Sequence, residues 1–146
     1  FQLDFVMCVH LTSPYFSQGY FAFRLLCNWM SLEHTGFNGN ITWTGYPNAL
    51  LGIVSNNLYA DKQLRLYGEG GIGLLLPDAA FSGKDQVLAG YGLFGFEFFF
   101  APAQHAPGSY FFEAGGIGTG AVADEIAGEP IYSNGFMLST GFRWYF

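Results

Sequence analysis

The final stretch of the chain, residues 131–146, constrains the fold more than any other part of the sequence. It reads IYSNGFMLSTGFRWYF. Counted two residues at a time, one face carries Asn134, Phe136, Leu138, Thr140, Phe142, Trp144 and Phe146, and the other carries Ser133, Gly135, Met137, Ser139, Gly141, Arg143 and Tyr145. A period of two is typical of a β-strand whose two faces meet different surroundings. Strands of soluble proteins have about 5–6 residues, whereas a tilted strand that crosses a bilayer needs about 9–11, so this length favours a membrane-spanning strand.

The aromatic residues of this stretch resemble a known pattern. Phe142, Trp144 and Phe146 alternate up to the last residue. The bacterial outer-membrane β-barrel proteins likewise end their final strand in an aromatic residue, most often Phe, and in that family the ending is the signal that the barrel-assembly machinery reads. By pattern the whole chain is similar to the small barrels of the OmpA transmembrane-domain and OmpX type. The resemblance implies a place in a Gram-negative outer membrane, in contact with its lipid and lipopolysaccharide.

The composition narrows the classes of protein that fit. The 146 residues are enough for one domain, residues 1–146. Charged residues make up 11% of the chain, against about 25% in an ordinary soluble domain. No uninterrupted apolar run reaches the length of a transmembrane helix, which leaves a β-barrel with lipid outside or a very apolar β-sandwich. The net charge of −6 and the lack of a basic patch argue against nucleic acid as a partner.

The alternation and the turn residues predict seven strands, at residues 1–10, 19–31, 48–60, 63–77, 87–101, 110–123 and 131–146. We expect polar loops at 32–47, 78–86 and 124–130, and turns at 12–18, 61–62 and 102–109. Phe1 begins within the alternating pattern, so we expect a mature or truncated sequence. Closed bacterial barrels have an even number of strands. The sequence therefore predicts an all-β, antiparallel up-and-down transmembrane β-barrel of eight strands, the first one missing before Phe1. The alternatives are a further pair of strands hidden in residues 32–60, or an open sheet.

The charged residues of the predicted strands all fall on the face opposite to the apolar one. They are Asp4, Arg24, Arg65, Glu69, Glu97, Glu113 and Arg143. An eight-stranded barrel is just wide enough for side chains to fill, and an unpaired charge inside it costs several kcal/mol. A charge near the middle of the lipid face costs about 2–4 kcal/mol. We therefore predict that these residues form an ion-pair network inside the barrel, whereas the alternative is that any amphipathic strand carries its charges on the polar face.

Two further patterns bear on the interior. Each of Glu69 and Glu113 shortly precedes a Gly-Gly-Ile-Gly run, at 70–73 and 115–118, where glycine permits sharp curvature and close approach of large groups. Residues 68–73 also fit G-x-G-x-x-G, but no helix follows, so no dinucleotide site is predicted. The alternation points Cys8 inward and Cys27 outward, which predicts two free thiols.

The sequence predicts no catalytic, cofactor or metal site. His10, His34 and His105 have no spacing typical of metal ligands. Some outer-membrane barrels deacylate lipids, and one such family has a His-x-Ser-Asn run. Here Ser133-Asn134 follows Ile131 where the motif needs histidine. We therefore predict a non-enzymatic membrane scaffold that presents loops 32–47, 78–86 and 124–130 to envelope partners. A subunit of a larger envelope complex, a porin-like gated pore or hydrophobic-solute channel, and a lipid deacylase are the alternatives.

Overall fold

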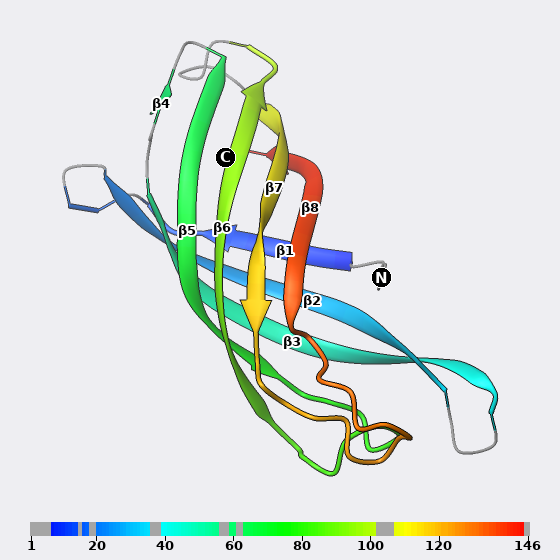
Figure 1. Cartoon of the computed structure of the whole chain (residues 1–146). Helices are drawn as coiled ribbons and strands as arrows, with labels where there is room; N and C mark the ends of the chain where they lie inside the picture. Colours follow the sequence, from blue (N-terminus) through cyan, green and yellow to red (C-terminus); the bar gives the residue numbers. More distant parts are fainter. Residues whose placement is uncertain are drawn as a thin grey trace.

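The computed structural model describes residues 7–14, 16–17, 20–35, 39–55, 59–60, 63–101 and 107–144. In this part of the chain seven antiparallel strands follow one another up and down and curl into a half-barrel (Figure 1). They are β1 (Met7–Thr12), β2 (Phe21–Thr35), β3 (Ile41–Ser55), β5 (Leu64–Leu75), β6 (Val87–Phe99), β7 (Gly108–Gly118) and β8 (Gly135–Trp144), and the two-residue β4 (Tyr59–Ala60) pairs with β5. The all-β, antiparallel up-and-down fold predicted from the sequence is confirmed. None of the described residues belongs to a helix that is long and apolar enough to cross a membrane.

Neighbours in the sequence are neighbours in the sheet, in the order β1-β2-β3-β5-β6-β7-β8. The sheet nevertheless brings distant strands together. Arg24 on β2 and Glu113 on β7 are four strands apart, roughly 19 Å in a flat sheet, yet Arg24 Nη1 donates to Glu113 Oε1 at 3.0 Å. The rings of His10 on β1 and Phe111 on β7 lie 5.4 Å apart. The curl therefore encloses an interior, while β1 and β8 remain the two edges of the described sheet.

The two faces of the sheet have opposite characters. On β6 the inner side chains Val87, Ala89, Tyr91, Leu93 and Glu97 are buried, and the outer side chains Leu88, Phe94, Phe96 and Phe98 are exposed. Alternate residues of a strand point to opposite faces, so the period-two pattern of the sequence places them as observed. Along β2, the inner residues run from Arg24 through Leu26 to Leu32, from charged to apolar. The interior thus has a charged part and an apolar part.

The prediction of a loop at residues 32–47, the longest loop predicted from the sequence, is wrong. Strand β2 continues to Thr35 and β3 starts at Ile41, with Glu33 opposite Trp43 and Thr35 opposite Ile41. β-Branched and aromatic residues favour a strand, and here they outweigh the polar and Gly/Asn-rich composition. The connection is reduced to residues 36–40. The hairpin extends beyond the paired parts of β1 and β5 (cyan in Figure 1).

The loop before the final strand is longer than predicted. Strand β7 ends at Gly118 and β8 begins at Gly135, so the connection spans residues 119–134 and not only 124–130. Ser133 and Gly135 have positive φ angles of 49° and 149°, which break the extended conformation that the sequence pattern predicts from residue 131. The predicted loop at 78–86 agrees with the gap between β5 and β6. The predicted turn at 61–62 lies outside the described residues, as do most of the turn at 102–109 and part of the turn at 12–18.

We name the two ends of the half-barrel by their connections. The loop side carries the connections 36–40, 76–86 and 119–134, and the turn side carries the other three.

Candidate functional site

The inner face carries a cluster of charged side chains, which we call the charge network. It consists of Arg24, Arg65, Glu69, Glu97, Glu113 and Arg143. The first five residues are buried, and the side chains of Arg65 and Arg143 are each 10% exposed. The structure thus brings together six of the seven residues predicted to form an interior network, and Asp4 lies outside the described residues.

Glu113 on β7 is the centre of the charge network. Its Oε1 accepts hydrogen bonds from Arg24 Nη1 at 3.0 Å, from Arg143 Nη2 at 2.5 Å and from the Tyr67 hydroxyl at 2.6 Å. Its Oε2 accepts from Ser139 Oγ at 3.0 Å. Because these donors come from β2, β5 and β8, one carboxylate joins four strands of the sheet.

Glu69 on β5 forms a second centre with Arg24. Arg24 Nη1 donates to Glu69 Oε2 at 2.6 Å, and the Tyr91 hydroxyl donates to Glu69 Oε1 at 2.7 Å. The other side of Arg24 reaches β1, where its Nε donates to Thr12 Oγ1 at 3.3 Å. Arg24 therefore connects β1, β2, β5 and β7.

The third centre, Glu97 on β6, lies towards the turn side. Its Oε2 pairs with Arg65 and, at 3.4 Å, with Arg143 Nη1. Ser109 Oγ donates to Glu97 Oε1 at 2.5 Å. Glu97 thereby links β5, β6 and β7 to β8, which is an edge strand of the described sheet.

Tyr67, like Tyr91 and Ser109, belongs to this site although the sequence pattern did not point to it. Its hydroxyl accepts from Arg143 Nη1 at 2.9 Å while it donates to Glu113. All three arginine groups of the charge network lie 5.1–5.2 Å from the centre of its ring, within the range of cation–π attraction. Gly95 stands opposite Tyr67 in the ladder, and any Cβ there would collide with the ring. The signal in the sequence is the position of Tyr67 between Arg65 and Glu69 on the same strand face.

The charge network is balanced, because three guanidinium groups face three carboxylates. A buried charge that loses its partner is costly, whereas a paired and hydrogen-bonded one is tolerated. The network cross-links strands that are not neighbours in the sheet. Its geometry supports the curl of the sheet and fills the interior between the strands.

A cluster of aromatic rings, which we call the loop cap, closes the interior at the loop side. Phe81 from the β5–β6 loop is fully buried between Tyr46 and Tyr132, with ring centres 5.4 and 5.1 Å away. The Tyr46 hydroxyl and Ser133 Oγ are hydrogen-bonded at 2.5 Å. Phe81 is therefore the point at which both long loops are fixed to the β2–β3 hairpin.

The two long loops also bond to each other outside the loop cap. The Gly83 amide donates to Asp124 Oδ1 at 2.9 Å, and the Glu125 amide donates to the Phe81 carbonyl at 3.2 Å. The bond from the Gly83 amide favours the ionised carboxylate and lowers the pKa of Asp124 below its ordinary value. The loops thus form one connected surface.

The outer face of the strands is apolar. Its exposed large side chains on β5 to β8 are Ile72, Leu74, Leu88, Phe94, Phe96, Phe98, Tyr110, Phe112, Phe136, Leu138, Phe142 and Trp144. Phe142 and Trp144, two residues of the predicted assembly signal, are 65% and 63% exposed, and Phe146 lies outside the described residues. Phe142 packs against Tyr110 with ring centres 5.4 Å apart. Among the charged residues of the described strands, Glu33 alone is exposed.

The groups with possible enzymatic chemistry are held in structural contacts. Ser133 bonds to Tyr46 and Ser139 to Glu113, and within the described residues neither serine has a histidine as a hydrogen-bond partner. No group of three or more His, Cys, Asp or Glu residues in the described part of the chain could hold a metal ion. Comparisons of the chain with protein-family models, with curated proteins and with solved structures found no match. The function is therefore inferred from the residues and their geometry.

Proposed function

We propose that the chain is a small β-barrel of the bacterial outer membrane that acts as a non-enzymatic scaffold and presents its loop side outside the cell. Outer-membrane lipid and lipopolysaccharide surround the outer face. The C-terminal strand, through Phe142, Trp144 and Phe146, is the part that the barrel-assembly machinery binds. Envelope proteins are the partners of the loop side.

The observation that carries this proposal is the inverted placement of charge and apolar surface. Six charged residues of the strands are held inside, and the outer face exposes many large apolar side chains. Soluble monomers seldom expose a contiguous apolar patch of more than a few hundred Å², and larger patches mark membrane or protein contacts. A bilayer is a favourable environment for this outer face, because its apolar side chains contact lipid instead of water and the charged side chains lie inside, away from the lipid.

The curl of the sheet supports a closed barrel of eight strands. Seven up-and-down strands leave β1 and β8 running in the same direction. One more strand between these two edges would be antiparallel to both, and would leave no unpaired edge in the bilayer, where open sheet edges are excluded.

The interior favours a scaffold over a pore. From the turn side to the loop side, the described interior is occupied by the charge network, by apolar side chains such as Leu26, Leu50 and Ala89, and by the loop cap. Packed side chains and paired charges leave little space for a hydrated solute. The loops, which carry Asp78, Lys84 and Asp124 at their surface, are then the part available for recognition.

A subunit of a larger envelope complex is the second candidate, and the β2–β3 hairpin favours it. Beyond the paired parts of β1 and β5, Ile41 and Trp43 are 67% and 53% exposed on the same face as Glu33. Aromatic residues are enriched in protein interfaces, whose apolar core is surrounded by a polar rim. Partners that co-purify in mild detergent with the natural chain, but not with a Trp43→Ser variant, would support this candidate.

The experiment that tests the proposal is the gel mobility of the detergent-extracted protein in SDS, with and without boiling. A closed barrel resists SDS until it is heated, so we expect two bands of different mobility. A protein that dissolves without detergent and shows a single mobility would contradict the membrane barrel and favour a soluble β-sandwich.

A further inference from the structure

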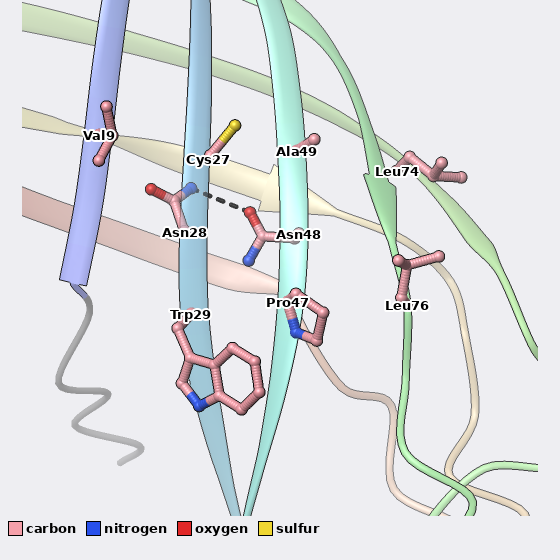
Figure 2. Close-up of a pocket in the computed structure, with 9 residues that line it drawn as sticks. All are labelled: Val9, Cys27, Asn28, Trp29, Pro47, Asn48, Ala49, Leu74 and Leu76. Carbon is pink, nitrogen blue, oxygen red and sulfur yellow. Dashed lines mark hydrogen bonds between the residues drawn. The ribbon is translucent and has the colours of Figure 1, made fainter.

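The outer face has a hollow of about 450 Å³ on the loop-side half of β1, β2, β3 and the end of β5 (Figure 2). Its lining residues are Val9, Cys27, Asn28, Trp29, Pro47, Asn48, Ala49, Leu74 and Leu76. The ladder places Val9, Cys27, Ala49 and Leu74 side by side across the four strands. Small side chains in the middle of this row and large ones at both ends explain the hollow.

The described lining of the hollow is mostly apolar. Cys27 is a free, exposed thiol, and Trp29 borders the hollow on its loop side, where Gly45 leaves the space that the indole occupies. Asn28 and Asn48 lie on the other face of the same strands and bond to each other, Nδ2 to Oδ1, at 2.9 Å (Figure 2). Among the residues that the structure describes, no charged residue lines the hollow. Its occupant is therefore an apolar group.

The size of the hollow distinguishes between possible occupants. A specific protein interface uses about 20–30 residues on each side, whereas nine of the described residues line this hollow. Small-molecule sites have volumes of about 300–1,000 Å³ and are mostly apolar. The dimensions therefore fit one flexible chain or small ligand better than a second copy of the protein.

The position of the hollow selects among apolar ligands. On β2 the outer residues pass from Leu25 and Cys27 to Trp29, and then to the charged Glu33 towards the loop side. Tryptophan favours the interface between hydrocarbon and headgroups. The hollow thus lies just inside the boundary of the apolar band, where the first part of an acyl chain is found.

We propose that this hollow is a seat for one acyl chain of a lipid in the leaflet on the loop side, held between Val9, Trp29, Leu74 and Leu76 over the small side chains of Cys27 and Ala49. This inference rests on the proposed function. The inference adds a defined lipid contact on the outer face to the proposed function.

The test uses tryptophan fluorescence of the protein folded into phosphatidylcholine vesicles. The chain has three tryptophans, so a Trp43→Phe/Trp144→Phe variant reports from Trp29 in the hollow. A Trp29→Phe/Trp43→Phe variant reports from Trp144, on the outer face near the other end. The quencher is 9,10-dibromostearic acid, added in increasing mole fraction. We expect the fluorescence of Trp29 to fall and saturate at a mole fraction several-fold lower than that which quenches Trp144.

Two substitutions test whether the hollow itself is responsible. Ala49→Phe fills the hollow. In this variant, quenching of Trp29 is expected to need as high a mole fraction of the brominated fatty acid as quenching of Trp144. Ala114→Phe makes the same change elsewhere on the outer face, opposite Leu138. This control is expected to leave Trp29 quenched at the same low mole fraction as in the protein without either change. Equal quenching curves for Trp29 and Trp144 in the unfilled protein would overturn the proposed seat.

Two other outcomes also overturn the proposal. In a Cys8→Ser variant, oxidative cross-linking through Cys27 would show that a second copy covers the hollow. If neither tryptophan is quenched and the protein shows no heat-dependent gel shift, the membrane barrel itself is refuted. A gel shift combined with equal quenching curves refutes the acyl-chain seat alone, so the two failures are distinguishable.

Discussion

Replacement of Glu113 by Gln is expected to destabilise the half-barrel more than any other single change in the charge network. The substitution keeps the size of the side chain and removes its charge. It leaves three arginines, Arg24, Arg65 and Arg143, facing only two carboxylates, those of Glu69 and Glu97. The interior of the described residues then carries one uncompensated positive charge.

The size of the expected loss in the free energy of unfolding follows from the contacts that remain in Glu113→Gln. Removing one partner of a buried ion pair costs about 3–5 kcal/mol. Arg24 keeps its bond to Glu69 at 2.6 Å, but Arg143 keeps only the 3.4 Å contact to Glu97 and its bond to Tyr67. We therefore expect the free energy of unfolding to fall by about 3 kcal/mol, the lower end of this range. For an m value of about 1–3 kcal/mol/M in urea, the unfolding midpoint falls by about 1–3 M.

The assay is urea unfolding of the protein in lipid vesicles, followed by tryptophan fluorescence at neutral pH. Glu33→Gln is the matched control, since Glu33 is exposed on β2 and surface substitutions change stability by about 0.5 kcal/mol or less. A midpoint for Glu113→Gln that equals that of the control would refute the structural importance of the charge network.

A double-mutant cycle separates the ion pair from the loss of packing. Arg143→Met alone is expected to destabilise the protein, because it leaves Glu97 and Glu113 with one arginine fewer. Combined with Glu113→Gln, it restores the balance of charge. The double variant is expected to lose less stability than the sum of the two single variants, by about 0.5–3 kcal/mol. Strict additivity would show that Arg143 and Glu113 do not interact energetically.

Three further predictions concern single contacts. Gly95→Ala places a methyl group against the Tyr67 ring, and overpacking of this kind is expected to cost about 1–3 kcal/mol in urea unfolding. Phe81→Ala leaves a cavity in the loop cap, and a loss of about 3–5 kcal/mol is expected in the same assay. The bond from the Gly83 amide to Asp124 is expected to weaken in acid. The folded pKa lies below the ordinary value of 3.8, so this contribution is present above that pH and is lost as the pH falls through the lowered pKa. The amide proton shift of Gly83, followed by NMR during acidification, measures this directly.

Each of these predictions has a control on the same element or loop. Gly90→Ala on β6 adds a methyl group into open space and is expected to leave the midpoint within about 0.5 kcal/mol of the natural chain. Leu88→Ala removes an exposed outer side chain of β6, so a loss as large as that of Phe81→Ala would contradict the loop cap. In an Asp124→Asn variant the Gly83 shift should no longer titrate. A transition at or above pH 3.8 in the natural chain would contradict the lowered pKa.

The facing of residues was predictable from the sequence, because it depends only on the period of two. Arg24, Glu69 and Glu113 lie on the inner face for this reason. The pairs that they form were not predictable. They depend on the register between strands and on how far the sheet curls, and both are set by contacts between residues distant in the chain. The contacts of Tyr67 with all three arginines follow from the same three-dimensional arrangement.

The boundaries of the strands were less predictable, because local composition competes with pairing. Thr35 and Ile41 belong to strands because they pair with each other, although a polar, Gly/Asn-rich stretch indicated a loop. Ile131 and Ser133 continue the alternation of the final strand in the sequence. The positive φ angle of Ser133 ends the extended conformation there, and this backbone geometry has no signature in the hydrophobic pattern.

In the proposed membrane barrel, the even-numbered residues of β8 face lipid and the odd-numbered ones face the interior. Nitroxide labels on single cysteines at positions 136 to 142, in a Cys8→Ser/Cys27→Ser background, test this orientation in vesicles. Collision with oxygen, which concentrates in the bilayer, should alternate with a period of two and peak at positions 136, 138, 140 and 142. Collision with a water-soluble nickel complex should stay low at these positions. Even-numbered labels that collide with the nickel complex as often as a label at the exposed loop residue Asp85 would contradict the membrane barrel.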